Sequence, residues 1–135
     1  MSKKIFKCHK ISEGCVVGEA LVSHDHIMFY LMEPKTGEVI EPGHDLKGKS
    51  VSKKILIFPG GKGSSVVQAD GLFQLNMNGN MPAAMLVQHP ETVLVSSAII
   101  MEVPMVDKVD PEFYDTVKDG DIIKVNADEG LIEIS

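Results

Sequence analysis

A glycine-rich run between an apolar segment and a helix-forming segment limits most strongly how this chain can fold. The run is Pro59-Gly60-Gly61-Lys62-Gly63-Ser64-Ser65, and it follows the apolar segment 54–58. The apolar residues of 65–78 recur at roughly helical spacing. Glycines let the backbone turn tightly and approach a ligand closely. The order therefore predicts a strand, a tight turn and a helix, with a serine near the helix N-terminus.

The predicted turn is suited to binding an anion. Free backbone N–H groups and the helix dipole attract negative charge at a helix N-terminus. Lys62 adds a positive charge close to Ser64 and Ser65. A serine that merely caps the helix gives the same pattern, so the residues alone leave both interpretations open. The run is neither a Walker A loop nor the dinucleotide-binding G-x-G-x-x-G pattern, because its spacing matches neither.

Length and charge narrow the class of protein. The sequence has 135 residues, which predicts one domain over 1–135 with a core that needs no disulfide. A net charge of −6 argues against a general nucleic-acid surface. No apolar run approaches the ~20 residues that a membrane span needs. No signal-type apolar segment follows the basic start of the chain, so we expect a cytoplasmic protein.

The cysteines and histidines predict no metal centre on this chain. Cys8 and Cys15 are the only cysteines, whereas an iron–sulfur cluster usually takes three or four thiolates. In a cytosolic protein we expect these two to be buried thiols and not a disulfide. The five histidines are scattered along the sequence, without metal-binding spacing. We therefore expect this chain to bind no cofactor itself.

The remaining segments predict a mixed fold. Residues 91–101 fit either a helix or a strand, because Glu91 suits a first helical turn and the β-branched residues suit a strand. Asp128-Glu129-Gly130 is typical of a hairpin turn. The other expected elements are strands at 5–11, 16–22, 27–32, 82–87, 121–126 and 131–134, a turn at 34–37, a short extended piece at 39–40 and a short apolar segment at 103–106. Together they predict a compact α+β domain.

Several short motifs, taken in order, resemble the small subunit of the aconitase X family. They are Pro34-x-Thr36-Gly37, His44-x-Leu46-x-Gly48, Lys54-x-Leu56-x-x followed by the glycine-rich run, Pro82-Ala83-Ala84 and Pro104-x-Val106-Asp107. The resemblance covers nearly the whole chain. It implies a swivelling β/β/α domain like the mobile domain of aconitases. In archaeal members this domain is a separate chain, and a large subunit carries the iron–sulfur cluster.

The resemblance also implies a reaction. Archaeal members are hydro-lyases that dehydrate (R)-5-phosphomevalonate to trans-anhydromevalonate 5-phosphate, in a mevalonate pathway to isoprenoids. Other members act on cis-3-hydroxy-L-proline instead. The expected partners are therefore a large subunit of the same dehydratase and a small phosphorylated hydroxy acid, and turnover is expected only from the two subunits together.

The family's catalytic serine carries over to the glycine-rich run. Aconitases use a serine after a Gly-x-Gly turn as the base that takes the substrate proton, and Ser64 matches that serine. Ser65 matches the second serine of the pair and is the secondary candidate. The next aconitase residue is an arginine that binds a substrate carboxylate, but here it is Val66. A tricarboxylate substrate is therefore not expected.

Substrate binding must then come from other groups. Lys62 is the nearest cation on this chain, and Gly61 and Gly63 are expected to line the site with it. His44 matches a family histidine and either faces the site, faces the partner or lies solvated in its loop. Asp107 is expected to be structural.

Three other functions compete with a lyase subunit. A phosphohistidine-carrying swivelling domain needs a histidine in the glycine-rich turn, and residues 60–71 contain none. A serine hydrolase needs a Ser–His–acid set, and Ser64 is not in a Gly-x-Ser-x-Gly elbow. A non-catalytic anion-binding or interaction module remains open. Such a module behaves the same with or without a large partner, whereas the lyase needs the partner for turnover.

Overall fold

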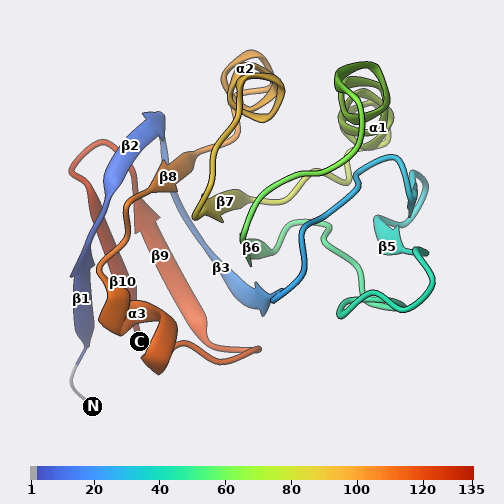
Figure 1. Cartoon of the computed structure of the whole chain (residues 1–135). Helices are drawn as coiled ribbons and strands as arrows, with labels where there is room; N and C mark the ends of the chain where they lie inside the picture. Colours follow the sequence, from blue (N-terminus) through green and yellow to red (C-terminus); the bar gives the residue numbers. More distant parts are fainter. Residues whose placement is uncertain (1–2) are drawn as a thin grey trace.

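The computed structural model describes residues 3–135 (Figure 1). Three helices accompany the strands in this part of the chain: α1 (Ser65–Met77), α2 (Thr92–Ile100) and α3 (Pro111–Thr116). The strands are β1 (Lys4–Lys7), β2 (His9–Ser12), β3 (Cys15–Val22), β4 (Met32–Glu33), β5 (Glu38–Val39), β6 (Ile55–Phe58), β7 (Ala84–Val87), β8 (Met105–Asp107), β9 (Ile122–Asn126) and β10 (Leu131–Ile134).

The main sheet curls until its two ends meet. Its strand order is β1-β10-β9-β3-β6-β7-β8-β2, yet only Cys8 separates β1 from β2 along the chain. The long strand β3 joins the two halves, because residues 15–19 pair antiparallel with β9 and residues 20–22 pair parallel with β6. Strands β3, β6, β7 and β8 are parallel neighbours. Their carboxyl ends consequently meet at one edge of the sheet.

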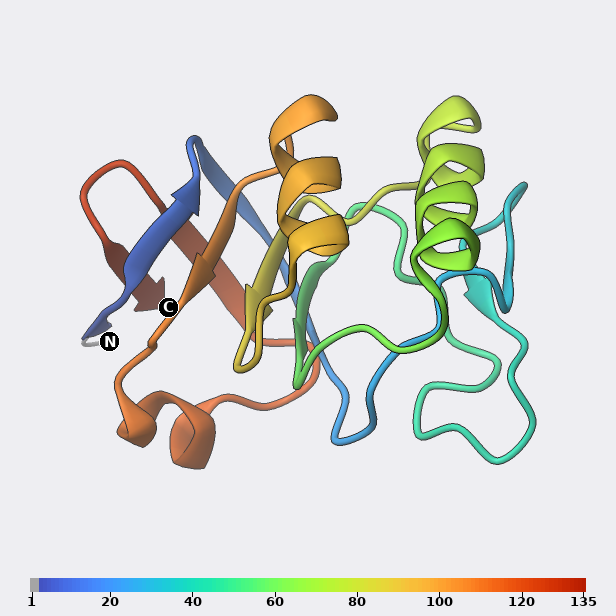
Figure 2. The same cartoon turned by 45° about the horizontal axis from the view of Figure 1, so that its top comes forward.

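Two cores fill the two sides of the parallel strands. In β6, Ile55 and Ile57 pack into the core enclosed by the curled sheet, while Leu56 and Phe58 pack under the helices. All four side chains are buried, as expected for a strand covered on both faces. Helices α1 and α2 lie side by side over the outer face (Figure 2). The layers are thus sheet, sheet and helix, which confirms the predicted α+β class and its swivelling β/β/α form.

Helix α1 begins and ends where the sequence predicts. Ser64 is its N-cap, and Gly79, with φ of +70°, follows the C-cap residue Asn78. Inside the helix, Gly71 lies against the loop of Phe29 and Tyr30. A Cβ at position 71 would lie 2.5 Å from the carbonyl carbon of Phe29 and 2.5 Å from the amide nitrogen of Tyr30. Only glycine therefore lets α1 pack this closely on the loop.

The structure corrects two of the predicted elements and settles whether residues 91–101 form a helix or a strand. The strand expected at 27–32 is wrong, because Leu31 N–H closes a turn onto the Met28 carbonyl and only the last residue of the segment joins β4. The segment 5–11 is two strands in different parts of the sheet. Residues 92–100 are helical, and Glu91 caps α2 by accepting a 3.0 Å hydrogen bond from Leu94 N–H. Helix α3 was not expected, although Pro111 at its first turn is a known start signal.

None of the helices in residues 3–135 is long and apolar enough to cross a membrane.

Candidate active site

The glycine-rich loop lies at the carboxyl ends of the parallel strands, where open α/β sheets bind ligands. It leaves β6 after Phe58 and is tied to both neighbouring segments by its backbone. On one side, Ile27 N–H donates to the Gly60 carbonyl at 2.9 Å, and Lys62 N–H donates to the Ile27 carbonyl at 3.0 Å. On the other, His89 N–H donates to the Pro59 carbonyl at 2.8 Å. The loop is therefore held in a defined shape before any ligand binds.

Ser64 stands at the point where the loop becomes a helix. Its Oγ accepts a hydrogen bond from Val67 N–H at 3.3 Å, and its side chain is exposed. Ser65 is the first residue of α1 and is also exposed. Within residues 3–135, no hydrogen-bond acceptor meets the backbone N–H groups of Ser64, Ser65 or Val66. The two serine hydroxyls thus sit beside free donors and the positive end of the helix dipole.

Lys62 is paired and not free in solvent. Its Nζ lies 2.6 Å from Oε2 of Glu41, with the two side chains 39% and 17% exposed. The other oxygen of Glu41, Oε1, is buried and has no hydrogen-bond partner in the described residues. Sequence reasoning missed Glu41, because it lies 21 positions from Lys62 and nothing local marks it. The pair fixes Lys62 beside the loop while leaving other ammonium N–H bonds able to donate.

The side chain of Gln68, on helix α1, contacts the glycine-rich loop. The residue is 3% exposed, on the first full turn of α1, and its Nε2 lies 3.5 Å from the Gly63 carbonyl. Its Oε1 is buried without a partner in residues 3–135 and contacts the position that a Cβ of Gly61 would occupy. Gly61 is therefore required for close approach to Gln68, and Gly63 for its φ of +100°. A glutamine on the buried side of a helix was the signal that sequence reasoning overlooked.

His44 holds the loops together and is not solvated. The side chain is buried, Nε2 lies 2.9 Å from the His26 carbonyl, and Nδ1 accepts from Leu46 N–H at 2.9 Å. Because a carbonyl only accepts and an amide N–H only donates, the ring carries its proton on Nε2. Both ring nitrogens are used, so none is left for a substrate. The structure makes His44 a positioning residue for the segment that contains His26.

Asp45 adds a second tie between the same loops. Its Oδ2 accepts from His24 N–H at 2.9 Å, and its own N–H donates to Oδ2 of Asp25 at 2.9 Å. The hydrogen bond from the His24 backbone, aided by the His24 ring, holds the pKa of the Asp45 carboxyl below its usual value. The loop after β3 is thereby fastened to the loop after β5.

The matching family model, the aconitase X swivel domain, covers residues 5–134. This chain belongs to the aconitase X family. The phosphomevalonate dehydratase small subunit of Methanosarcina acetivorans is 44% identical over 95% of this chain and 89% of its own length. That of Methanocella arvoryzae is 46% identical over 96% of this chain and 98% of its own. The predicted family is therefore confirmed.

A solved structure agrees with this fold. The crystal structure of Thermococcus kodakaraensis aconitase X, in its holo-form, superposes with a TM-score of 0.88 at 38% identity. The match covers 98% of each chain. The relatives named above are small subunits, which implies a large-subunit partner for this aconitase X swivel domain as well.

The residues of this swivel domain do not fit an iron–sulfur cluster. Residues 3–135 contain no group of three or more His, Cys, Asp or Glu side chains that could hold a metal. Cys15 is exposed and Cys8 is half-buried, so the expectation that both thiols are buried is wrong. Burial, with the nearby charges of Asp107 and Asp110, raises the pKa of Cys8 to about 11, which keeps it a thiol. Asp107 itself is buried with its Oδ1 2.7 Å from Nδ1 of His9, which agrees with the structural role expected for it.

Proposed function

We propose that this chain is the small subunit of a cytoplasmic hydro-lyase that removes water from (R)-5-phosphomevalonate. Ser64 is the proton acceptor, and a large subunit supplies the iron–sulfur cluster. The names of the relatives support the substrate. The observation that carries the proposal is the exposed hydroxyl of Ser64, set at the N-cap of α1 among free backbone N–H groups.

The reaction needs a base next to an acidic C–H bond. In this dehydration the C–H bond beside the carboxylate breaks, its electron pair forms the C=C bond, and the hydroxyl on the next carbon leaves. Ser64 Oγ takes the proton from that carbon. For this, Ser64 reacts as its alkoxide. The substrate hydroxyl departs as hydroxide and combines with the proton that the Ser64 hydroxyl released, giving water. We assign the departure of the hydroxide to the large subunit.

The surroundings of Ser64 explain how a serine can act as a base. An ordinary hydroxyl is a poor proton acceptor, so its anion has to be stabilised before proton transfer. The Val67 N–H already donates to Oγ, and the dipole of α1 favours negative charge at the same place. Ser65 and the free N–H groups beside it are positioned to hold the substrate carboxylate. Val66 is uncharged, so it cannot bind a carboxylate as the arginine of tricarboxylate aconitases does.

Reconstitution tests the proposal directly. The chain is co-expressed with a candidate large subunit and assayed without oxygen on 5-phosphomevalonate and on cis-3-hydroxy-L-proline. We expect turnover of the phosphorylated substrate by the two-subunit complex and none by the small subunit alone. Turnover of hydroxyproline only would assign the chain to the other branch of the family. Turnover by the isolated small subunit would contradict the division of work between the chains.

Lys62→Ala is expected to weaken substrate binding more than it slows the reaction. A lysine acts on phosphate as a point charge, and a lost hydrogen bond to a charged group costs enough to raise KM about tenfold. An effect on KM with little change in kcat is the pattern of lost ground-state binding. Steady-state kinetics of the reconstituted complex measure both constants.

Glu41→Gln is the matched control for Lys62→Ala. The alanine variant leaves the Glu41 carboxylate buried without its partner, which destabilises the loop by itself. The glutamine variant removes the ion pair but keeps the lysine charge, so KM should stay close to that of the wild type. Equal rises of KM in both variants would mean that the pair only supports the loop.

A further inference from the structure

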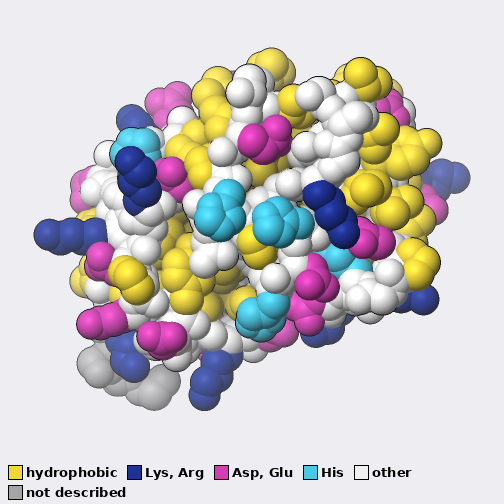
Figure 3. All heavy atoms as spheres, viewed as in Figure 1, with side chains coloured by type: hydrophobic (Ala, Val, Ile, Leu, Met, Phe, Trp, Pro, Cys, Tyr) yellow, Lys and Arg dark blue, Asp and Glu magenta, His cyan; other side chains and the backbone are white. Residues whose placement is uncertain are grey.

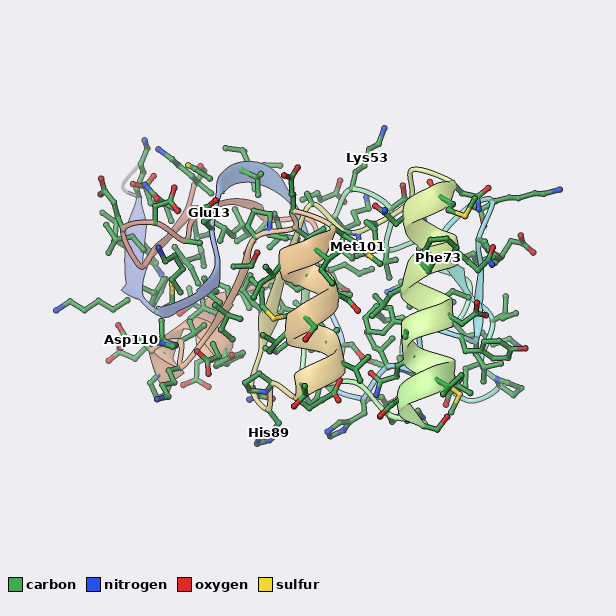
Figure 4. The ribbon with its side chains drawn as sticks, turned by 90° about the horizontal axis from the view of Figure 1, so that it is seen from above. Glu13, Lys53, Phe73, His89, Met101 and Asp110 are labelled. Atoms are coloured by element: carbon green, nitrogen blue, oxygen red, sulfur yellow. The ribbon has the colours of Figure 1, made fainter. Side chains whose placement is uncertain are left out.

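Two histidines flank the glycine-rich loop. The rings of His26 and His89 are parallel, with an interplanar angle of 6° and centroids 6.3 Å apart. Both residues are exposed, and within residues 3–135 neither ring forms a hydrogen bond or an ion pair. Histidine side chains gather near the centre of this face, with a basic side chain beside them (Figure 3). His89 lies at the beginning of α2, at the opposite end from Met101 (Figure 4).

The fold brings these rings together across Gly60. His26 is in the loop after β3, where its carbonyl accepts from His44 and its neighbour Ile27 pairs with Gly60. His89 follows β7 and donates its N–H to Pro59. A Cβ at position 60 would lie 2.9 Å from the His89 carbonyl oxygen and 3.5 Å from Cδ2 of His26. The absence of a side chain at Gly60 thus lets both histidine segments close on the loop.

The donors near this loop suit a tetrahedral anion. The 13 Lys and Arg residues of the chain are all lysines, so it contains no guanidinium for a bidentate pair with a carboxylate or a phosphate. The loop offers separate donors instead, namely two imidazole N–H groups and the ammonium of Lys62 two residues after Gly60. An imidazole has a ring N–H to donate in either protonation state. Donors spread over three segments can reach different oxygens of one phosphate.

The shape of the proposed substrate requires a second anion site. 5-Phosphomevalonate carries its carboxylate and its phosphate at opposite ends of a five-carbon chain. The carboxylate must stay near Ser64, because the carbon that loses a proton is bonded to it. The phosphate then has to bind away from Ser64, and the histidines lie on the same sheet edge, at the other end of the glycine-rich loop.

We propose that His26 and His89, with Lys62, bind the phosphate group of the substrate. This inference rests on the proposed function for the identity of the phosphate ester. His26 and His89 are binding residues here, and Ser64 remains the base.

The test compares histidine variants of the reconstituted complex. His26→Gln and His89→Gln are expected to raise KM for 5-phosphomevalonate about tenfold each, and more when combined, with kcat within a few-fold of the wild type. With unphosphorylated mevalonate as substrate, the variants and the wild type should have the same kcat/KM. His24→Gln is the matched control, because His24 is exposed in the same loop but its ring lies 3.3 Å from Asp45.

The outcomes separate this inference from the proposed function. An unchanged KM in the double variant of an active complex would overturn the inference alone and assign the phosphate to the large subunit. If the wild-type complex does not dehydrate 5-phosphomevalonate, the proposed function fails and NMR of the full small subunit decides the inference. Inorganic phosphate should then shift the ring signals of His26 and His89 saturably and leave those of His24 in place. Equal shifts of the ring signals of His26, His89 and His24 would contradict a specific phosphate site at His26 and His89.

Discussion

Replacing Ser64 by alanine is expected to lower the turnover of the two-subunit complex by roughly 10²–10⁴, the usual loss when a general base is removed. KM should change little, because Oγ takes the proton only as the reaction proceeds and contributes little to ground-state binding. Steady-state kinetics on 5-phosphomevalonate, with the assembly of the two subunits checked by gel filtration, measure the effect. Ser65→Ala should cost less, because Ser65 helps to hold the substrate carboxylate and does not take the proton.

The structure supplies a control that separates catalysis from helix capping. Ser64 is the N-cap of α1, so its replacement by alanine also costs about 1 kcal/mol of stability. Asparagine caps as well as serine but has no hydroxyl. Ser64→Asn should therefore unfold like the wild type and react as slowly as Ser64→Ala. Wild-type turnover by Ser64→Asn would contradict the assignment of Ser64 as the base. If Ser65→Ala were inactive while Ser64→Ala stayed active, the base would be Ser65 instead.

The strand, turn and helix around the site were predictable from an apolar strand, a glycine-rich turn and a capping serine, although the apolar residues Val66, Phe73 and Met77 of the helix are exposed. The segment 54–58 is apolar throughout, the glycines break the pattern, and Ser64 is a strong helix cap. The strand prediction for the segment 27–32 failed because an apolar pattern indicates which residues are buried but not which backbone groups pair. Its residues Ile27 and Phe29 are buried, but they pack against α1 from a loop. Tertiary packing replaced the strand pairing that the pattern suggested.

The candidate site was predictable only where its residues are neighbours in the sequence. Ser64, Ser65 and Lys62 belong to one run, so the pattern and the family resemblance both mark them. Glu41 and the pair His26 and His89 reach the loop from other segments through strand order and backbone hydrogen bonds. A single sequence carries no local signal for such contacts. The prediction therefore named the proposed base, Ser64, but lacked most of the groups around it.

Gly71→Ala is expected to destabilise the chain by about 1–3 kcal/mol, the usual cost of overpacking a core. Helix propensity alone predicts the opposite sign, since alanine is about 1 kcal/mol better than glycine within a helix. The clash decides the outcome, because the new Cβ would meet backbone atoms of Phe29 and Tyr30 at 2.5 Å, and backbone cannot rotate away as a side chain can. Urea unfolding of the small subunit, followed by circular dichroism, gives the change in stability.

Ala69→Gly in the same helix measures the propensity effect by itself. Ala69 is exposed, so its replacement changes helix propensity without creating a clash, and we expect a loss of about 1 kcal/mol. If packing decides at position 71, then both substitutions destabilise although they change glycine content in opposite directions. A Gly71→Ala variant as stable as the wild type would show that α1 can move away from the loop of Phe29. Such a movement would carry Ser64 with it, so turnover of the complex would still fall while stability stayed unchanged.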